Sequence, residues 1–483
     1  MGSQIRIFRE RVRDNLTAPP PTADADIDIA TAVDLLRSSR ESGLVLLDGD
    51  RRPVGLLTEA DIARRVALRA SASDPVASVM TRDVRTVALD EFLYRAIARM
   101  RRYGLRHLPA VDEAGRLAGM LHLDDALQAA SEDLVARIDH LSGAARSEDD
   151  RPDLKTVKAA EVDVAADLLA DNVPATEVLA LITDVNNDMY RRVTRAILDE
   201  MGGDPPAGFA VLVMGSGGRG ENFLSPDQDN GLVLTDYPDA EHDRIDGWFL
   251  EFADRLTVRM DEIGFPLCKG NVMATNPLWR KTQSQWREQL AIWMRKRSAA
   301  AVFLSDIFFD FRVVAGNPDL AVPLREQITQ GMARNPPFLR DMLDAHEGQR
   351  SPLGLFGRFR TDPERRGAIH LKHYGTQPLI ASVRLLALKA GIPRVATLDR
   401  IDALADGGVF DADERDETRA AFSFVCDLLL RSQISDFQSG REVTNFVELG
   451  GLRPAQKRDL RDAFHTIDTL CDRVRADLTG DVF

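Results

Sequence analysis

The sequence is poor in cysteine, with only Cys268, Cys426 and Cys471 among 483 residues. The three are widely separated, and none has the C-x-x-C spacing of a zinc or redox motif. This excludes a disulfide framework and a cysteine zinc site. Isolated thiols of this kind are typical of small buried side chains in a reducing compartment.

Long apolar runs and an excess of positive charge are also missing. No stretch approaches the roughly 18 uninterrupted apolar residues of a membrane span, and the first residues hold no apolar core of signal-peptide length. We therefore expect a cytoplasmic protein with no membrane partner. The 62 Lys and Arg residues are outnumbered by 76 Asp and Glu, for a formal net charge of −14. This balance argues against nucleic acid as a partner, because binding a phosphate backbone needs clustered basic side chains.

What is present is a globular composition, 44% hydrophobic and 29% charged, in a chain long enough for several domains. Residues 1–26 are charged and then Pro-rich, which predicts an N-terminal arm. A helix–strand–turn–strand–helix pattern then occurs twice within 27–130. One copy cannot bury its sheet face alone, so we expect the two copies to pair.

Each copy ends in a glycine-containing strand followed by an acidic helix start. The first reads Gly55-Leu-Leu-Thr58-Glu-Ala-Asp61 and the second Gly119-Met-Leu-His122-Leu-Asp-Asp125. A hydroxyl and a carboxylate at a strand-to-helix junction suit the ribose hydroxyls and phosphate of a nucleotide. The same two side chains, Thr58 and Asp61, would also serve simply to cap the helix.

The two copies resemble tandem CBS domains, and DPVASVMTRDVRTVALDE resembles the usual join between them. The resemblance implies AMP, ADP or ATP as an effector, with Thr58, Asp61 and Asp125 as ligand residues. It also implies a homodimer formed through CBS pairs. His122 departs from the Ser or Thr that is usual at the second site.

A possible catalytic centre follows a helical connector over 131–205. An apolar strand over 209–214 leads into Gly215-Ser-Gly-Gly-Arg-Gly-Glu, and Asp227-Gln-Asp-Asn precedes a second apolar strand over 231–234. Alternation along an extended chain places Asp227 and Asp229 on one side and Gln228 on the other. The two carboxylates would therefore face a glycine-lined bend together.

This constellation suits transfer of a nucleotide. Mg²⁺ (or Mn²⁺) prefers a few hard oxygen ligands together with substrate phosphates, so Asp227 and Asp229 are the predicted metal ligands and catalytic residues. Small residues at Gly215, Ser216 and Gly217 let backbone amides approach a triphosphate. Positive charge would come from Arg219, with Lys269 and Arg280 as further candidates.

Other interpretations stay open at this point. Gly215-x-Gly217-x-x-Gly220 satisfies the dinucleotide-binding fingerprint, but that motif must open a long helix and Pro226 follows closely. The stretch SPDQDNG is compatible with a plain turn, although a plain turn needs no glycine-rich segment upstream. His242-Asp243 resembles part of a phosphohydrolase dyad at a helix start, and His370 with His373 lacks a third metal ligand.

The pattern of a Gly-Ser pair, ten residues and D-x-D is similar to that of the DNA polymerase β superfamily. The run from about Ile182 to Leu324 resembles the catalytic core of bacterial PII-protein uridylyltransferases. It resembles more closely the DUF294 nucleotidyltransferase domain that is found fused to CBS pairs. The matching text is GSGGRGE, DQDN, KGNVMATNPLWR and DFRVVAG.

The resemblance implies an α/β and α multidomain protein. Its parts are a tandem CBS pair, a polymerase-β-like core with a mixed sheet over 206–330 and a C-terminal helical substrate-binding domain over 331–483. It implies a signal-transduction enzyme that transfers UMP or AMP from an NTP to an acceptor hydroxyl, on a protein or a small molecule, under CBS control. Many relatives add a third carboxylate on a later strand, where this chain has Lys269, Asn271 and Asn276. A catalytically inactive nucleotide-sensing adaptor is therefore the alternative.

Overall fold

The structure is a computed structural model of the chain. It describes residues 11–16, 20–39, 42–66, 70–82, 84–103, 105–129, 153–170, 172–346, 348–354 and 357–480. The chain forms two compact units, Met1–Asp153 and Leu154–Phe483.

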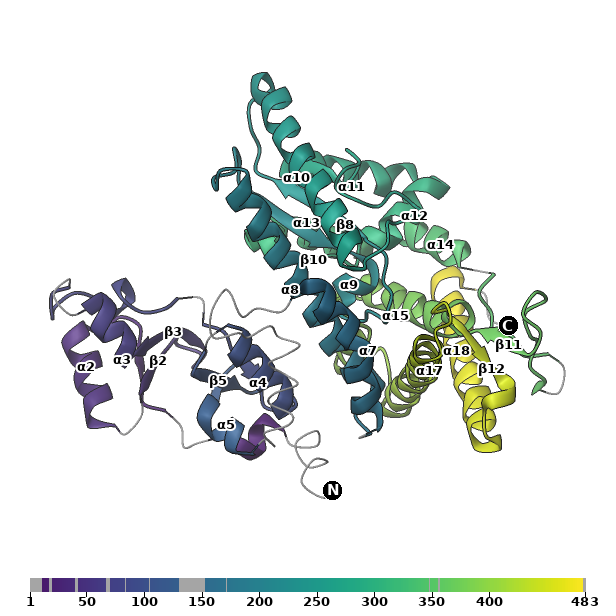
Figure 1. Cartoon of the computed structure of the whole chain (residues 1–483), viewed down its shortest axis with the longest axis horizontal. Coiled ribbons are helices and arrows are strands. Elements are labelled where there is room, and N and C mark those ends of the chain that lie inside the picture. Colours follow the sequence, from purple (N-terminus) through teal and green to yellow (C-terminus); the bar gives the residue numbers. More distant parts are fainter. Residues whose placement is uncertain are drawn as a thin grey trace. The chain divides into compact units, whose positions relative to one another are not determined.

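The first unit contains the same three-stranded sheet twice (Figure 1). In each, a short strand runs parallel to a central strand, which pairs antiparallel with the last one. The strands are β1 (Thr22–Asp24), β2 (Gly43–Leu47) and β3 (Pro53–Thr58), then β4 (Val87–Ala88), β5 (His107–Val111) and β6 (Leu117–His122). The helices are α2 (Ile29–Ser38), α3 (Glu59–Asp61), α4 (Leu93–Arg102) and α5 (Leu123–Ala129). The repeat predicted from the sequence is confirmed.

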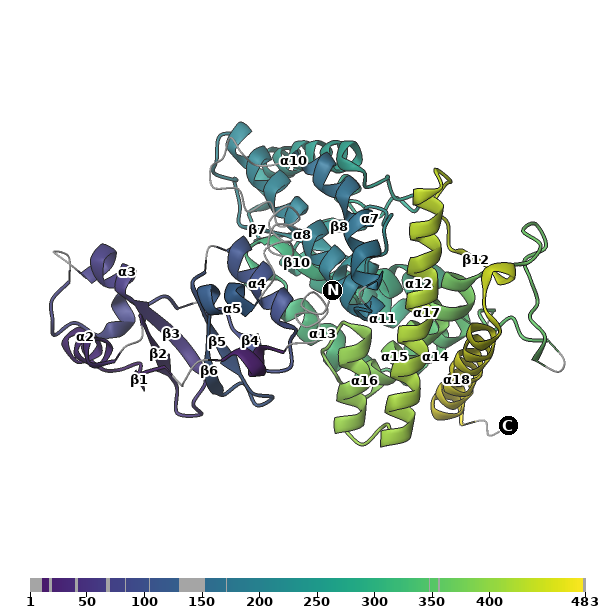
Figure 2. The ribbon, with the colours of Figure 1, turned by 60° about the horizontal axis from the view of Figure 1, so that its bottom comes forward.

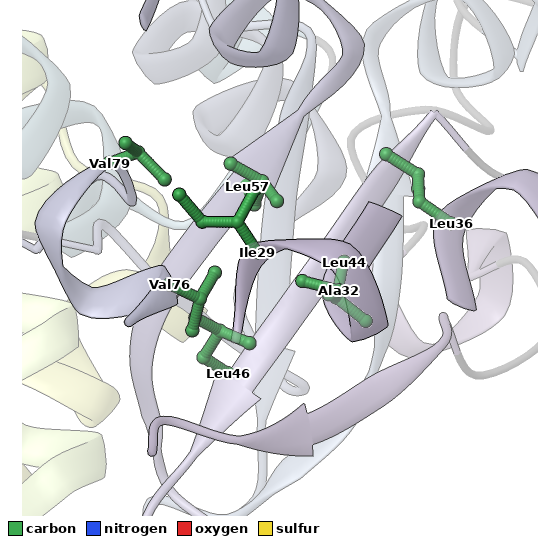
Figure 3. Packing of buried hydrophobic residues seen from close by; sticks show 8 residues of the cluster. All are labelled: Ile29, Ala32, Leu36, Leu44, Leu46, Leu57, Val76 and Val79. Atoms are coloured by element: carbon green, nitrogen blue, oxygen red, sulfur yellow. The ribbon is translucent and has the colours of Figure 1, made fainter. Parts of the chain in front are cut away.

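Strand β2 is apolar throughout because both of its faces are covered. Leu44 and Leu46 pack with Ile29, Ala32 and Leu36 of α2 in one cluster (Figure 3). Val45 and Leu47 alternate to the other face and pack with Met120 of β6. The two copies therefore bury their sheets against each other, as the pairing argument predicts.

Part of the stretch expected as an N-terminal arm is built into this unit. Val12, in the short turn η1 (Val12–Asn15), is fully buried, and its backbone N–H donates to the Glu91 carbonyl at 2.8 Å. Strand β1 lies in the same stretch and pairs with β2. Apolar burial and backbone pairing hold these residues, neither of which a charged and Pro-rich composition indicates.

The second unit is built around a mixed four-stranded sheet of order β10-β7-β8-β9. Its strands are β7 (Phe209–Val213), β8 (Asn230–Leu234), β9 (Arg280–Thr282) and β10 (Arg312–Gly316). Strand β7 is antiparallel to both neighbours, whereas β8 and β9 run parallel. Strands β7 and β8 are buried over their whole length, which explains why every residue of them except Asn230 is apolar or glycine.

Helices surround this sheet (Figures 1 and 2). They are α7 (Leu154–Ala170), α8 (Ala175–Glu200), α9 (Gly215–Arg219), α10 (His242–Ile263), α11 (Gln283–Lys296), α12 (Ala299–Phe308), α13 (Val322–Ala333) and α14 (Pro336–Ala345). Helix α8, expected as a connector, packs on α7, α10, α17 and β10. It is therefore part of the second unit's core.

The C-terminal part is mainly helical. Its helices are α15 (Gln377–Lys389), α16 (Thr397–Asp406), α17 (Ala412–Gln438) and α18 (Pro454–Thr479). Two short strands, β11 (Ala368–His370) and β12 (Phe446–Glu448), form an antiparallel pair. Helices α15 and α17 each pack on both α16 and α18. The predicted fold class, α/β with a mixed sheet followed by a helical region, is confirmed.

Candidate active site

The glycine-rich segment forms a single helical turn, α9, directly after β7. Gly215 has a positive φ of 55° at its start, and Gly220 ends it in the left-handed conformation with φ 80°. Gly218 lies against the chain before β10, where a Cβ would be 1.7 Å from the Asp310 carbonyl oxygen. Because this helix is only five residues long, the long helix that the dinucleotide fingerprint requires is absent from this described segment.

The two aspartates stand just before β8, which begins at Asn230. Gln228 between them is fully buried, and its side-chain amide donates to the carbonyls of Thr257 at 3.0 Å and Phe265 at 2.8 Å. Asp227 is exposed and Asp229 is half-buried. The predicted alternation of side chains along this stretch is therefore present, and the two hydrogen bonds of the Gln228 side chain fix the loop to the protein interior.

Asp227 and Asp229 line one pocket together with residues of the glycine-rich turn. The pocket is lined by Asn187, Tyr190, Val213, Met214, Ser216, Gly217, Asn222, Pro226, Asp227, Asp229 and Phe265. A Cβ on Gly215 would lie 3.4 Å from the Asp229 carboxylate, and the Met214 N–H donates to the Asp229 carbonyl at 2.9 Å. The structure thus brings four of the predicted residues, Ser216, Gly217, Asp227 and Asp229, to one place, with Gly215 beside them.

The environment of Asp229 disfavours its charge. Burial raises the pKa of Asp229 to about 6, and the nearby charge of Asp227 adds to the rise. A hydrogen bond from the Cys268 thiol and the positive charges of Lys372 and Arg219 work in the opposite direction. A carboxylate that is costly to ionise next to another carboxylate is typical of a site that awaits a positive ligand.

Helix α8 contributes polar residues that the sequence interpretation missed. Asn187 and Tyr190 line the pocket, and both are almost completely buried. The Thr183 hydroxyl accepts from the Asn222 N–H at 2.7 Å, and Asn222 in turn accepts from the Ser216 hydroxyl at 2.9 Å. The available signal was the pair Asn186-Asn187 within an otherwise apolar helical stripe, since buried asparagines need a polar partner or a ligand.

Arg219, predicted to contact phosphate, is instead placed in a buried ion-pair cluster. Its guanidinium donates to Glu221 at 2.7 Å and to Asp310 at 3.0 Å. Asp310 is fully buried and also accepts from Arg384 of α15 and Arg400 of α16, both at 2.7 Å. Burial opposes ionisation there, yet the three arginines hold the pKa of Asp310 far below its ordinary value. Arg219 thus joins the glycine-rich turn α9 to the C-terminal helices.

Of the remaining candidates, Arg280 is held in a pair of its own, whereas Lys269 directly follows Cys268, whose thiol donates to the Asp229 carboxylate. Arg280 donates to both oxygens of Asp246, at 2.8 and 2.9 Å, while Lys269 is exposed. The His373 N–H donates to the His370 ring at 3.0 Å. His242 and Asp243 occupy the first turn of α10. Among the described residues, no group of three or more His, Cys, Asp and Glu side chains is arranged to hold a metal ion.

In the first unit, Thr58 and Asp61 form a capping box on α3. The Thr58 hydroxyl donates to the Asp61 carboxylate at 2.7 Å, and the Asp61 N–H donates back to that hydroxyl at 3.2 Å. Asp125 is exposed near the start of α5. His122 of β6 lies beside His107 of β5, with ring centres 5.1 Å apart. The cap is formed as the structural interpretation predicts, and its carboxylate stands at the strand end where a nucleotide is expected.

Family models match most of the chain in the order of these parts. The CBS domain matches residues 12–68 and 76–132, "Putative nucleotidyltransferase DUF294" matches 160–300, and "Putative nucleotidyltransferase substrate binding domain" matches 336–478. The chain belongs to the CBS-containing DUF294 nucleotidyltransferase family. The family match includes α8 from residue 160 onward, which agrees with the packing of that helix in the second unit.

Curated relatives match this DUF294 protein over about a quarter of its length. They include an uncharacterised 17.7 kDa protein of Acidianus ambivalens, 33% identical over 22% of this chain and 63% of its own. L-aspartate semialdehyde sulfurtransferase of Methanocaldococcus jannaschii is 31% identical over 24% of this chain and 22% of its own. Inosine-5'-monophosphate dehydrogenase of Nitrosopumilus maritimus is 30% identical over 22% of this chain and 21% of its own.

Solved structures with a similar segment include the Pyrobaculum aerophilum CBS domain protein complexed with AMP. It is 27% identical, the match covers 27% of this chain and 98% of that one, and the TM-score is 0.25. A CBS domain pair complexed with 5'-methylthioadenosine and S-adenosyl-L-methionine is 29% identical over 25% of this chain and 94% of its own, with a TM-score of 0.23. Across the described residues, no helix is long and apolar enough to cross a membrane.

Proposed function

We propose that this DUF294 protein transfers a nucleoside monophosphate, UMP or AMP, from an NTP to an acceptor hydroxyl on a protein. The observation that carries the proposal is the convergence of Asp227 and Asp229 with Ser216 and Gly217 on one pocket. Adenosine nucleotides at the CBS pair, held by Thr58, Asp61 and Asp125, would regulate the reaction. The resemblance to the PII-protein uridylyltransferases supports a protein acceptor, and a small-molecule acceptor fits the same chemistry.

The donor set fits a magnesium ion bound together with substrate. Two carboxylates line the pocket, and Mg²⁺ is usually held by one or two carboxylates plus substrate phosphates, not by a cage of protein ligands. The described residues offer no third acidic, His or Cys ligand. Bound by Asp227 and Asp229, the ion would neutralise phosphate charge and lower the pKa of an attacking hydroxyl.

The protein's own groups would orient the nucleotide. The small side chains of Ser216 and Gly217 leave room for phosphate oxygens close to the backbone of α9. Asn187 and Tyr190, both almost completely buried, line the pocket on the side of α8. Gln228, hydrogen-bonded on the opposite side, holds the two aspartates in their orientation.

We expect the C-terminal helices to present the acceptor. Besides the Asp310 cluster, the Glu221 carboxylate accepts from the Thr397 N–H at the start of α16 at 2.7 Å. The segment between the glycine-rich turn and the aspartates is therefore tied to these helices at two buried points, at Glu221 and at Leu224, whose N–H donates to the Gln433 side chain of α17 at 3.3 Å. A rigid connection of this kind suits a reaction that needs the acceptor hydroxyl aligned with the α-phosphate.

Label transfer from α-³²P-NTP tests the proposal. Asp227→Ala with Asp229→Ala is expected to abolish transfer of label to acceptors in a cell lysate, because no carboxylate remains to hold the metal ion. The control is Asp254→Ala with Asp261→Ala on α10, where both side chains are exposed. Transfer should be unchanged in the control, and circular dichroism should show both proteins folded.

Unchanged transfer in the aspartate double variant would contradict the proposed site. Tight NTP binding by the wild-type protein without pyrophosphate release, across lysates and all four NTPs, would instead favour the adaptor. Mass spectrometry of the lysate proteins, searching for a nucleotide-sized mass gain, identifies the acceptor and the base.

A further inference from the structure

Two adjacent asparagines on α8, Asn186 and Asn187, are both buried but differ in their partners. The Asn186 carboxamide accepts from the ammonium group of Lys158 on α7 at 3.0 Å. Asn187 is only 2% exposed, and its side chain forms no hydrogen bond with any other residue that the structure describes. Buried polar side chains in folded proteins nearly always have a partner. The Asn187 carboxamide is therefore free to bind something other than the protein chain.

The Asn187 side chain opens into the pocket of the two aspartates. It lines that pocket together with Asp227, Asp229 and Ser216. Its carboxamide is not among the completely enclosed polar groups that lack a partner, so the small accessible part of this side chain faces the pocket. Ser216 is already engaged, because its hydroxyl donates to the Asn222 side chain at 2.9 Å. Asn187 thus offers a free oxygen and free N–H donors beside the carboxylates.

The preceding turn of α8 connects this face of the helix to the glycine-rich turn. Thr183 lies four residues before Asn187, so the two side chains share one face of the helix. The Thr183 hydroxyl is buried and accepts from the Asn222 N–H at 2.7 Å. Asn222 follows the glycine-rich turn α9 closely and accepts from the Ser216 hydroxyl within it. These contacts fix Asn187 beside that turn.

The following turn of α8 connects the same face to the aspartate loop. Tyr190 lies three residues after Asn187, and its ring packs edge-on against that of Phe265, with ring centres 5.9 Å apart. The Phe265 carbonyl accepts at 2.8 Å from the side chain of Gln228, the residue between the two aspartates. Asn187 lies between these two connections. Its place beside the carboxylates is therefore set by contacts that involve neither of them.

The space that these side chains enclose suits a single ion. Its volume of about 20 Å³ has room for one ion or water molecule and not for a nucleotide. Two carboxylates line it, which favours a cation. A carboxamide oxygen is a hard ligand of the kind that Mg²⁺ and Mn²⁺ accept. It adds a third oxygen without a third negative charge, which the two neighbouring carboxylates would oppose.

We propose that the Oδ1 atom of Asn187 is the third protein ligand of the metal ion at Asp227 and Asp229. The inference rests on the proposed function. It takes from α8 the oxygen that many similar enzymes take from a carboxylate on a later strand. With the oxygen on the metal ion, the amide N–H groups of Asn187 are left to donate to a phosphate oxygen of the NTP.

Binding of Mn²⁺ to the full chain without nucleotide tests this assignment, followed by the loss of the electron paramagnetic resonance signal of free Mn²⁺. Only the binding that Asp227→Ala with Asp229→Ala abolishes is counted, which confines the measurement to the proposed site. Asn187→Leu nearly keeps the size of the side chain and removes its oxygen. It is expected to weaken Mn²⁺ binding at least about tenfold, since even outer partners of metal ligands are worth that much. Circular dichroism checks that the variant is folded.

Two further measurements separate a direct ligand from a structural role. The waters bound to Mn²⁺ are counted from the line broadening in H₂¹⁷O, and their number should rise by one in Asn187→Leu, because water replaces the lost ligand. Asn187→Asp keeps the shape of the side chain and turns the amide into a carboxylate. It should bind Mn²⁺ more tightly than wild type, because a charged oxygen attracts the ion more strongly.

The matched control is Thr194→Val, which removes a buried hydroxyl of the same helix that does not line the pocket, and its Mn²⁺ binding should be unchanged. A wild-type Mn²⁺ affinity in Asn187→Leu would overturn the assignment, and so would weaker binding without the additional water. Weaker binding in Asn187→Asp as well would show a structural role and overturn it too. Mn²⁺ binding that persists without Asp227 and Asp229 would contradict the proposed function itself, whatever Asn187 contributes.

Discussion

Asp229 combines a functional position with an environment that opposes its charge. Its carboxylate stands over Gly215, next to Asp227, and burial raises its pKa to about 6. The folded protein therefore holds this proton more tightly than the unfolded chain does. Stability is lost as the pH rises from the ordinary aspartate value of 3.8 to about 6, and the loss persists above that range. Strain of this kind at a ligand site is relieved when a cation binds.

Asp229→Asn is accordingly expected to stabilise the metal-free protein while removing activity. At pH 7.5 with EDTA the gain should be about 1 to 2 kcal/mol, below the full value of the shift because Asp229 is partly exposed. At pH 4.5 the difference from wild type should shrink, since the wild-type carboxyl is then largely protonated. The melting temperature followed by tryptophan fluorescence checks this, because all four tryptophans lie between Trp248 and Trp293 in the core. A variant less stable than wild type at pH 7.5 would contradict it.

At the scale of elements, the short helix α9 owes its position to a glycine that the motif alone does not explain. Gly218 is not among the pocket residues, yet the chain preceding β10 passes directly over it. A methyl group would collide with backbone, and the backbone at this point carries Asp310, which pairs with three arginines. The glycine therefore sets the distance between the glycine-rich turn α9 and the edge strand β10.

Gly218→Ala should displace α9 and cost at least about 1–3 kcal/mol, the range for overpacking a core position. Nucleotide transfer should fall together with stability, because Ser216 and Gly217 move with the turn. Gly247→Ala in α10, where a Cβ meets nothing within 4 Å, is the matched control and should be neutral or slightly stabilising. Thermal unfolding by tryptophan fluorescence and label transfer measure the two effects. A wild-type melting temperature in Gly218→Ala would rule out the close approach.

At the scale of the whole second unit, one buried carboxylate joins the core to the C-terminal helices. Asp310 accepts from three arginines that belong to the glycine-rich turn α9, to α15 and to α16. Arg384 also pairs with Asp306, and Arg219 with Glu221, so the cluster balances three arginines against three acids. An ion-pair cluster of this kind is sensitive to the loss of any member, because the remaining charges stay buried.

Asp310→Asn is expected to destabilise the second unit by about 3–5 kcal/mol, as for other buried pairs that lose one partner. Label transfer should fall as well, since Arg219 loses a partner that holds the glycine-rich turn α9 beside the proposed site. Asp319→Asn, an exposed change near the same strand, should stay within about 0.5 kcal/mol of wild type. Urea unfolding followed by tryptophan fluorescence compares the two. Equal stability of both variants would show that the cluster does not hold the unit together.

The sequence by itself determined the features that depend only on residues close together in the chain. Backbone alternation places Asp227 and Asp229 on the side opposite Gln228, and the apolar strands, the CBS repeat and the order of the DUF294 motifs were readable for the same reason. Spacing along the chain is sufficient there, because neighbouring residues share one strand or one turn.

Only the tertiary structure decided which distant groups meet these residues. The sequence predicts Arg219 as a phosphate ligand. In the structure its guanidinium donates to Asp310, which lies 91 residues later in the chain. Asn187 and Tyr190 become pocket residues because α8 packs beside the glycine-rich turn α9. Contacts of this kind depend on how whole helices pack, and no spacing within one segment encodes them.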